Sequence, residues 1–209
     1  MSKEWKGNRN SVSANNGMST VWHPEQRAAG DFYTTDPEAV KLFLQKTKRQ
    51  LGPHIDFTFW EPACGSGNIS KVLESDGYGH PVISTDLYDR GYGTPGIDFL
   101  KAELPDKNVK VIITNPPYKL ADEFVLHALD ILPPDGAYIA LHNINYLAGK
   151  KRFLDIYNKG YLNSIYIFSG RIFCYKNGIE TGQSSPVNYG WFIYKKNNYN
   201  NFPPQINWL

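Results

Sequence analysis

The sequence contains very little cysteine: Cys64 and Cys174 are its only two cysteines among 209 residues. Two cysteines cannot form the disulfide framework of a small secreted domain or a four-cysteine zinc site, and neither lies in a CxxC spacing. The five histidines also lack the spacing that metal ligands need. We therefore expect a reducing compartment and no metal.

Long apolar runs and a strong net charge are absent as well. No run approaches the roughly twenty apolar residues that span a bilayer, and the polar start, MSKEWKGNRNSVSANNG, lacks the apolar stretch of a signal peptide. These absences predict a cytoplasmic protein with no membrane partner. The formal net charge is only +2, so nucleic-acid binding does not follow from charge, and any basic surface has to be local.

What the sequence does contain is enough apolar material for one globular domain. Hydrophobic residues make up 41% of the chain and charged residues 20%, a balance that excludes a disordered chain. The first residues are rich in Ser, Asn and Gly, which predicts a flexible polar tail over 1–21. We expect a single domain over 22–209.

Strand and helix patterns alternate along this domain. Asp36-Pro37-Glu38 is a helix start, because Asp36 can cap the first backbone N–H groups and Pro37 suits the first helical position. The predicted strands lie in FTFWE, HPVISTDLY, KVIITNPPY, AYIALH, NSIYIFSGR and NYGWFIYKK, with helical segments between most of them. This order predicts an α/β domain with a largely parallel sheet, whose ligands bind beyond the carboxyl ends of the strands.

A glycine-bearing turn, EPACGSGN, follows the first of these buried strands at 61–68. Its two glycines allow the backbone to approach a ligand where a side chain would collide. The turn lacks the third glycine of the dinucleotide fingerprint and the GK[ST] of a triphosphate site, which weakens both nucleotide-binding interpretations. On its own it would equally be a tight turn with no ligand.

Carboxylates follow at the ends of later segments. Asp86 ends the next strand, where its carboxylate can accept hydrogen bonds from two ribose hydroxyls. Asp98 can accept from an exocyclic amine, and Phe99 beside it can form a wall for an adenine ring. Each of these residues alone is more typical of a surface turn or a core position, so the argument rests on their order along the chain.

A second motif, Asn115-Pro116-Pro117-Tyr118, directly follows an apolar strand. The two prolines fix φ and remove two N–H donors, which makes a rigid exit from the strand. If the Asn115 side-chain oxygen and the Pro116 carbonyl both accept from an aromatic amine, its nitrogen can pyramidalise and direct its lone pair at an electrophile. Tyr118 can then stack on the base. The alternative is that Pro-Pro simply ends the strand.

In this order the motifs resemble those of the class I S-adenosylmethionine-dependent methyltransferases, and within them the adenine-N6 DNA methyltransferases of gamma-like motif order. The pieces that carry the resemblance are DFYTTDP at 31–37, EPACGSGN at 61–68, STDL at 84–87, IDFL at 97–100 and NPPY at 115–118. The final strand, YGWFIY, is similar to the closing strand of small phage or prophage adenine methylases.

The resemblance implies a Rossmann-like domain with a mostly parallel seven-stranded sheet, helices on both faces and an antiparallel last strand. It implies S-adenosylmethionine as cofactor, S-adenosylhomocysteine as product and no metal. The implied cofactor residues are Tyr33, Thr34, Thr35, Glu61, Ala63, Gly65, Gly67, Asp86, Asp98 and Phe99. The implied catalytic residues are Asn115, Pro116, Pro117 and Tyr118.

The implied activity is methyl transfer to N6 of adenine in DNA, in a bacterium or a virus-infected bacterium, for restriction protection or regulation. Double-stranded substrate would have to flip its target base out of the helix. Neither the segment between the two motifs nor the rest of the chain leaves room for a large target-recognition domain, so we expect short or relaxed sequence specificity. Phosphate contacts are expected from a set of basic residues, although each could equally be a solvated charge: Lys150, Lys151, Arg152, Arg171 and Lys176.

Two alternatives stay open at this point. NPPY also occurs in methyltransferases that act on RNA bases and on protein glutamine side chains, so the acceptor can differ while the chemistry stays the same. The second alternative is a catalytically inactive nucleic-acid-binding module built on the same fold. The presence of all the expected cofactor and target residues weighs against it.

Overall fold

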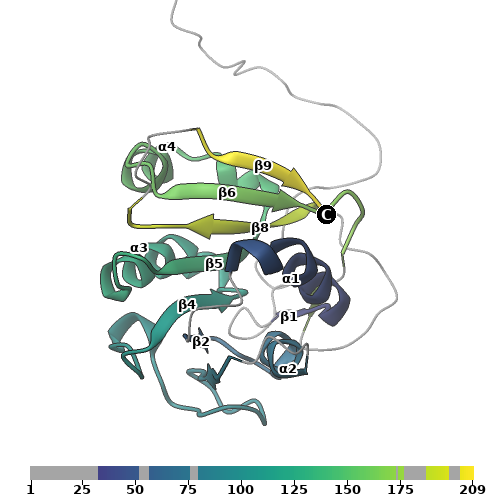
Figure 1. Cartoon of the computed structure of the whole chain (residues 1–209), viewed down its shortest axis with the longest axis vertical. Coiled ribbons are helices and arrows are strands. Elements are labelled where there is room, and N and C mark those ends of the chain that lie inside the picture. The colour runs from purple at the N-terminus through teal and green to yellow at the C-terminus, as the bar shows by residue number, and fades with distance from the viewer. Residues whose placement is uncertain (1–32, 52–56, 76–79, 173, 177–186, 198–202) are drawn as a thin grey trace, which may run out of the picture.

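The apolar runs form the strands of one seven-stranded sheet in the computed structural model, which describes residues 33–51, 57–75, 80–172, 174–176, 187–197 and 203–209. The strands lie side by side in the order β3-β2-β4-β5-β8-β6-β9 (Figure 1). Their bounds are β2 Thr58–Glu61, β3 Val82–Ser84, β4 Val109–Thr114, β5 Ala137–Asn143, β6 Leu162–Ile167, β8 Tyr189–Tyr194 and β9 Gln205–Trp208.

The directions of the strands confirm the predicted fold class. β3, β2, β4 and β5 are mutually parallel, and β8, the strand predicted from YGWFIY, runs antiparallel between β5 and β6. The sequence does not predict β9, which pairs in parallel with β6 at the edge of the sheet. Ile206 and Trp208 of β9 are largely exposed, so this strand lacks the buried apolar pattern that marks the others.

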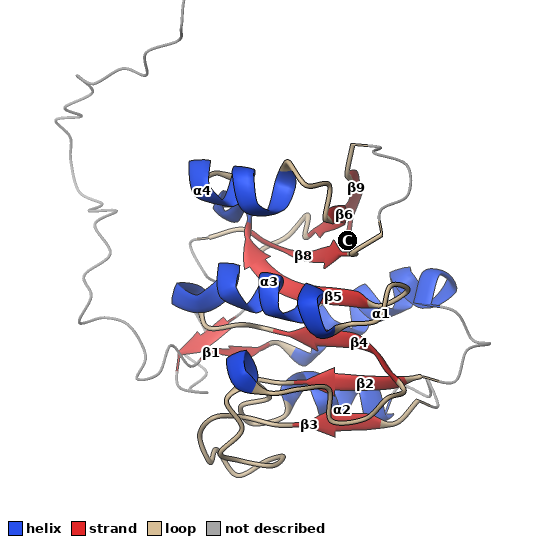
Figure 2. Ribbon diagram, turned by 90° about the vertical axis from the view of Figure 1, so that its left-hand side faces the viewer, coloured by secondary structure: helices blue, strands red, loops and turns tan. Residues whose placement is uncertain are grey.

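Helices cover both faces of the sheet, as expected (Figure 2). On one face lie α1 (Pro37–Leu51) and α2 (Asn68–Ser75), and on the other lie α3 (Ala121–Ile131) and α4 (Lys150–Arg152), which continues as a π-helical turn over Phe153–Tyr157. No helix in the described ranges is long and apolar enough to cross a membrane.

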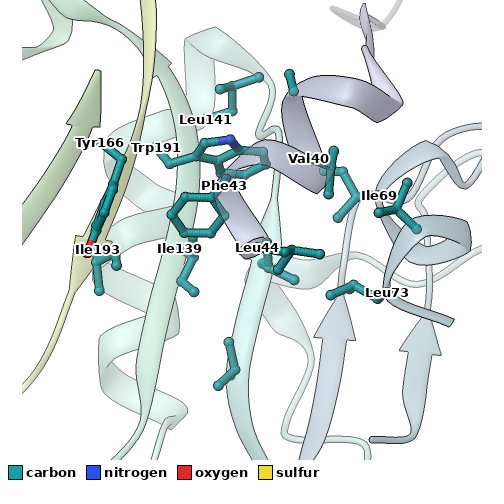
Figure 3. Packing of buried hydrophobic residues seen from close by; sticks show 14 of the residues in the cluster. Val40, Phe43, Leu44, Ile69, Leu73, Ile139, Leu141, Tyr166, Trp191 and Ile193 are labelled. Atoms are coloured by element: carbon teal, nitrogen blue, oxygen red, sulfur yellow. The ribbon is translucent and has the colours of Figure 1, made fainter. Parts of the chain in front are cut away.

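The apolar stripe of α1 shows why this helix packs where it does. Val40, Phe43 and Leu44 recur at the i, i+3, i+4 spacing that places side chains on one helix face, and all three are fully buried (Figure 3). Phe43 stacks on Trp191 of β8 with ring centroids 5.0 Å apart, and it meets the edge of Tyr166 at 5.5 Å. The helix starts as predicted, because the Asp36 Oδ1 accepts a 2.9 Å hydrogen bond from the Glu38 N–H.

A second, small sheet lies at the carboxyl edge of the main one. β1 (Tyr33–Thr35) pairs antiparallel with β7 (Cys174–Lys176), so that segments about 140 positions apart in the sequence meet here. The sequence indicates neither strand. The expected polar tail over 1–21, and the start of the expected domain at residue 22, lie outside the described residues.

Candidate active site

A cavity of about 380 Å³ opens at the carboxyl ends of β2, β3 and β4. This is the position where open α/β sheets bind their ligands. Most of the residues predicted from the sequence line it: Tyr33, Thr34, Thr35, Glu61, Ala63, Gly65, Asp86, Asp98, Phe99, Asn115 and Pro117. Three of the predicted cofactor and catalytic residues do not belong to its lining: Gly67, Pro116 and Tyr118. The structure therefore brings both motifs to one cavity.

Asp86 lies directly against the glycine turn in the wall of the cavity. Its Oδ2 accepts a 2.8 Å hydrogen bond from the Gly65 N–H, and its Oδ1 accepts a 2.8 Å bond from the Tyr88 N–H. These bonds hold a buried carboxylate in one orientation, while each oxygen keeps a further lone pair. A carboxylate fixed in this way suits a ligand that carries two neighbouring hydroxyls.

Glu61 is buried at the end of β2. Its Oε2 accepts hydrogen bonds from the backbone N–H of Ser70, at 2.8 Å, and from the Ser70 hydroxyl. Burial raises the pKa of Glu61 from 4.5 to about 8, although the Ser70 bonds act in the opposite direction. Because an opposite charge favours the carboxylate, a cationic ligand group in the cavity would lower this pKa again.

Gly67 contributes to the site by leaving room for a side chain. Its φ of +80° is a conformation that favours glycine, and a Cβ at this position would lie 2.4 Å from the ring of Tyr92. The Tyr92 hydroxyl in turn donates a 2.9 Å hydrogen bond to Glu74 of α2. Gly67 thus lets the loop after β3 pack onto the glycine turn, a role that needs no contact with the cavity.

Cys64, between the two predicted cofactor residues Ala63 and Gly65, is not set up as a nucleophile. Burial raises the pKa of its thiol to about 12. Its sulfur lies 3.5 Å from the Tyr92 carbonyl oxygen, in a close-packed position between the glycine turn and the loop after β3. In this position Cys64 acts as a small packing residue.

Asp98 and Phe99 form another wall of the cavity. The Asp98 carboxylate accepts from the Leu100 N–H at 3.2 Å and pairs with the Lys101 Nζ at 2.8 Å, and the hydrogen bond from Lys101 lowers its pKa. Phe99 is buried against the rings of Trp60 and Phe124, with centroids 5.2 and 4.7 Å away. The result is a flat apolar surface with a charged acceptor beside it.

Asn115 has the most informative geometry in the cavity. Its Nδ2 donates to the Tyr33 carbonyl oxygen at 3.2 Å and to the Thr35 Oγ1 at 3.3 Å. Because the Tyr33 carbonyl can only accept, these contacts fix which end of the amide points toward β1. The Asn115 Oδ1 at the other end is buried and has no hydrogen-bond partner in the described part of the protein.

A second amide from the glycine-turn motif also holds β1 in place. Asn68 Nδ2 donates a 2.9 Å hydrogen bond to the Thr35 carbonyl oxygen, and Asn68 Oδ1 accepts one from the Ser66 hydroxyl at 3.0 Å. β1 is therefore fixed by amides from both sequence motifs. This role of Asn68 does not follow from the sequence, because the partner lies 33 residues earlier in a strand too short to predict.

Tyr118 lies on the β1 side of the NPPY motif and is part of an aromatic group. Its ring centroid is 5.4 Å from that of Tyr33, and its hydroxyl is 3.0 Å from the hydroxyl of Tyr189 at the start of β8. The two contacts hold the Tyr118 ring next to the strand that covers the cavity. Tyr189 is 71 residues away in the sequence, and no local pattern connects it to NPPY.

The basic residues expected to contact phosphates occupy different environments. Lys150 and Lys151 are exposed at the start of α4, and Arg171 is exposed in the loop after β6. Arg152 is held inside the protein by an ion pair with Asp122, at 2.6 Å. The side chain of Lys176 lies outside the described residues, as does most of the loop over 175–187. Among the described residues, no group of three or more His, Cys, Asp or Glu side chains could hold a metal ion.

Comparisons with known proteins define the fold. No family model and no curated protein matches the sequence. A solved Listeria monocytogenes protein, assigned as a class I S-adenosylmethionine-dependent methyltransferase, superposes with a TM-score of 0.62 at 16% identity, over 84% of this chain and 65% of that one. The chain thus spans slightly less than two thirds of that protein.

Two further solved structures share the architecture. A Pyrococcus horikoshii protein assigned as an RNA methyltransferase has a TM-score of 0.56 at 17% identity, over 78% of this chain and 86% of that one. Precorrin-6y C5,15-methyltransferase of Geobacter metallireducens has a TM-score of 0.51 at 13% identity, over 82% of this chain and 95% of that one. The chain has the Rossmann-like fold of the class I S-adenosylmethionine-dependent methyltransferases.

Proposed function

We propose that the protein transfers a methyl group from S-adenosylmethionine to the N6 amino group of adenine in DNA. The observation that carries this proposal is the orientation of the Asn115 amide, whose buried Oδ1 has no partner while its Nδ2 is held by β1. A buried acceptor without a partner costs about 1–3 kcal/mol. An amine donor from a substrate would remove this cost.

The chemistry at Asn115 is catalysis by hydrogen bonding. The lone pair of an aromatic amine is delocalised into the ring, which makes the amine a poor nucleophile. A fixed acceptor at Asn115 Oδ1, helped by the Pro116 carbonyl oxygen, draws both N–H groups into hydrogen bonds and favours a pyramidal nitrogen. Methyl transfer to this nitrogen would form the nitrogen–carbon bond as the methyl–sulfur bond breaks, and the amine would lose one proton to solvent. Tyr118 stacks on the target base.

The rest of the cavity is suited to the cofactor. S-adenosylmethionine, when bound, supplies an electrophilic methyl group on its sulfonium. Glu61 would pair with the ammonium of its amino-acid end, with Tyr33, Thr34 and Thr35 of β1 and the turn residues Ala63 and Gly65 around it. Asp86 would accept from the two ribose hydroxyls, and Asp98 and Phe99 would bind the adenine amine and ring. No metal is part of this proposal.

One alternative acceptor has support from the comparisons. The Pyrococcus horikoshii structure is assigned as an RNA methyltransferase, and the Asn115 geometry would accept an amine of an RNA base equally well. The DFYTTDP segment favours DNA, because its resemblance is to the DNA adenine branch. A protein glutamine side chain would also fit the same acceptor, since its amide nitrogen has a delocalised lone pair too.

The test is transfer of labelled methyl from S-adenosylmethionine to unmethylated DNA, total RNA and a protein extract, followed by mass spectrometry of nucleosides and peptides. We expect N6-methyladenine in DNA with the wild-type protein and none with Asn115→Ala. Asn108→Ala is the matched control, because Asn108 is exposed just before the opposite end of β4, and it should keep full activity. Label confined to RNA or protein would overturn the choice of acceptor.

A further inference from the structure

One face of α4 exposes both lysines and large apolar side chains. Lys150, Lys151, Phe153 and Leu154 are all exposed, Phe153 by 53% and Leu154 by 50%. On the opposite face, Ile156 is fully buried against the sheet. Two adjacent large apolar side chains with this exposure, next to two lysines, give this face the mixed composition of a candidate interaction surface. We call these four residues the α4 surface.

Arg152 fixes the orientation of this surface and does not belong to it. Its Nε donates to Asp122 Oδ1 at 2.6 Å, and its Nη1 donates to the carbonyl oxygens of Tyr146 and Ala148 at 2.7 and 2.6 Å. Its guanidinium also lies over the ring of Tyr146, 3.7 Å from the centroid. The charge of Arg152 is therefore engaged within the protein, while Lys150 and Lys151 point their charges to solvent.

The anchor places the α4 surface next to the catalytic motif. Asp122 lies in the first turn of α3, which follows NPPY after the single 3₁₀ turn Tyr118–Leu120. α4 itself follows β5, the strand next to the one that carries Asn115, and both strands end at the same edge of the sheet (Figure 2). A ligand that extends out of the cavity along this edge would meet the α4 surface.

The local geometry of α4 supports a binding role. The Asn158 N–H donates to the Phe153 carbonyl oxygen at 2.7 Å, an i→i+5 bond that closes a π-helical turn. Such turns occur frequently at functional sites. The carboxylate on this segment, Asp155, is half-buried, and the acidic neighbour Asp122 is already paired with Arg152, so the exposed face keeps the positive charge of two lysines.

We propose that the α4 surface binds the DNA strand that flanks the target adenine. Lys150 and Lys151 would contact backbone phosphates, and Phe153 with Leu154 would contact a base exposed when the target leaves the helix. Single bases stack favourably on exposed aromatic side chains without sequence preference. This inference rests on the proposed function, because it takes the cavity as the destination of the target base.

The experiment measures binding of a short fluorescein-labelled, adenine-containing DNA duplex by fluorescence anisotropy over a range of salt concentrations, with S-adenosylhomocysteine present. Each lysine that neutralises a phosphate contributes about 0.9 to the slope of log K against log salt. Lys150→Gln/Lys151→Gln should therefore reduce this slope by about 1.8. The control is Lys107→Gln/Lys195→Gln, which removes equal charge at the opposite edge of the sheet and should leave the slope unchanged.

A second variant separates stacking from charge. Phe153→Ala/Leu154→Ala should weaken binding about tenfold at every salt concentration without changing the slope, since stacking does not depend on released counterions. Because both side chains are largely exposed, the variant should keep the wild-type thermal unfolding midpoint. The proposal would be overturned if both variants bound DNA with the same affinity and the same salt slope as the Lys107→Gln/Lys195→Gln control. It would also be overturned if the protein bound RNA but not DNA.

The same assay distinguishes this inference from the proposed function. If the wild-type protein binds DNA through the α4 surface but transfers no methyl group to it, the surface stands and the choice of acceptor fails. If N6-methyladenine forms in DNA while all α4 variants bind normally, the proposed function stands and this inference fails.

Discussion

The titration of Glu61 has a direct consequence for stability. Its pKa is about 8 in the folded protein, against 4.5 for an ordinary glutamate. Because the folded-state pKa is raised, the folded protein binds more protons than the unfolded chain between these two values. The free energy of unfolding contributed by Glu61 is therefore highest at low pH and falls as the pH rises through this window.

The size of the effect follows from the pKa shift. At about 1.4 kcal/mol per pKa unit, charging Glu61 in the cofactor-free fold costs on the order of 5 kcal/mol. Linkage then predicts a loss of about 2 kcal/mol between pH 6 and pH 8 from this one group. Glu61→Gln removes the titration, and its side-chain carbonyl can still accept from Ser70.

The assay is urea unfolding of the cofactor-free wild type and of Glu61→Gln at both pH values, followed by tryptophan fluorescence. The free energy of the wild type minus that of the variant should fall by about 2 kcal/mol between pH 6 and pH 8, because every other titrating group is common to both proteins. Ser75→Ala, at the end of α2, is a control that should show no pH-dependent difference. A wild-type minus Glu61→Gln difference that stays constant would refute the reasoning about Glu61.

Three further predictions concern other parts of the structure. Gly67→Ala should lose about 1–3 kcal/mol of unfolding free energy in urea, more than Gly91→Ala, which has nearly the same φ but open space in place of the Tyr92 ring. Arg152→Ala should lose about 2–3 kcal/mol, because it breaks the ion pair with Asp122 and removes the hydrogen bonds to the carbonyl oxygens of Tyr146 and Ala148, of which the Tyr146 oxygen keeps the Tyr157 hydroxyl as a donor. Cofactor binding at pH 7 should release close to one proton from Glu61, seen as calorimetric enthalpies that depend on the buffer; enthalpies independent of the buffer would contradict this.

Local patterns in the sequence were sufficient for the main elements of the fold. Asp36-Pro37 predicts the start of α1 because capping depends only on residues next to each other. The buried strands β2, β4, β5 and β8 stand out because parallel or central strands are apolar on both faces. β9 carries no such signal, since Ile206 and Trp208 at the sheet edge are exposed.

Some features of the candidate site also follow from local sequence patterns, and others do not. The position of Asp86 opposite Gly65 follows from the rule that strand ends of a parallel sheet converge. The contacts that fix β1 do not follow from any local pattern, because they join Asn68 and Asn115 to a three-residue strand far away in the sequence. The same holds for Arg152, whose sequence context indicates a solvated charge but whose partner is in α3.

The most direct test of the account is nucleoside mass spectrometry of DNA from cells that lack their own adenine methylation and express either the wild-type protein or Asn115→Ala. If the free Asn115 oxygen receives the amine of adenine, N6-methyladenine appears with the wild type and is absent with the variant at equal protein level. N6-methyladenine at the same level with both proteins, or with neither, would contradict the account.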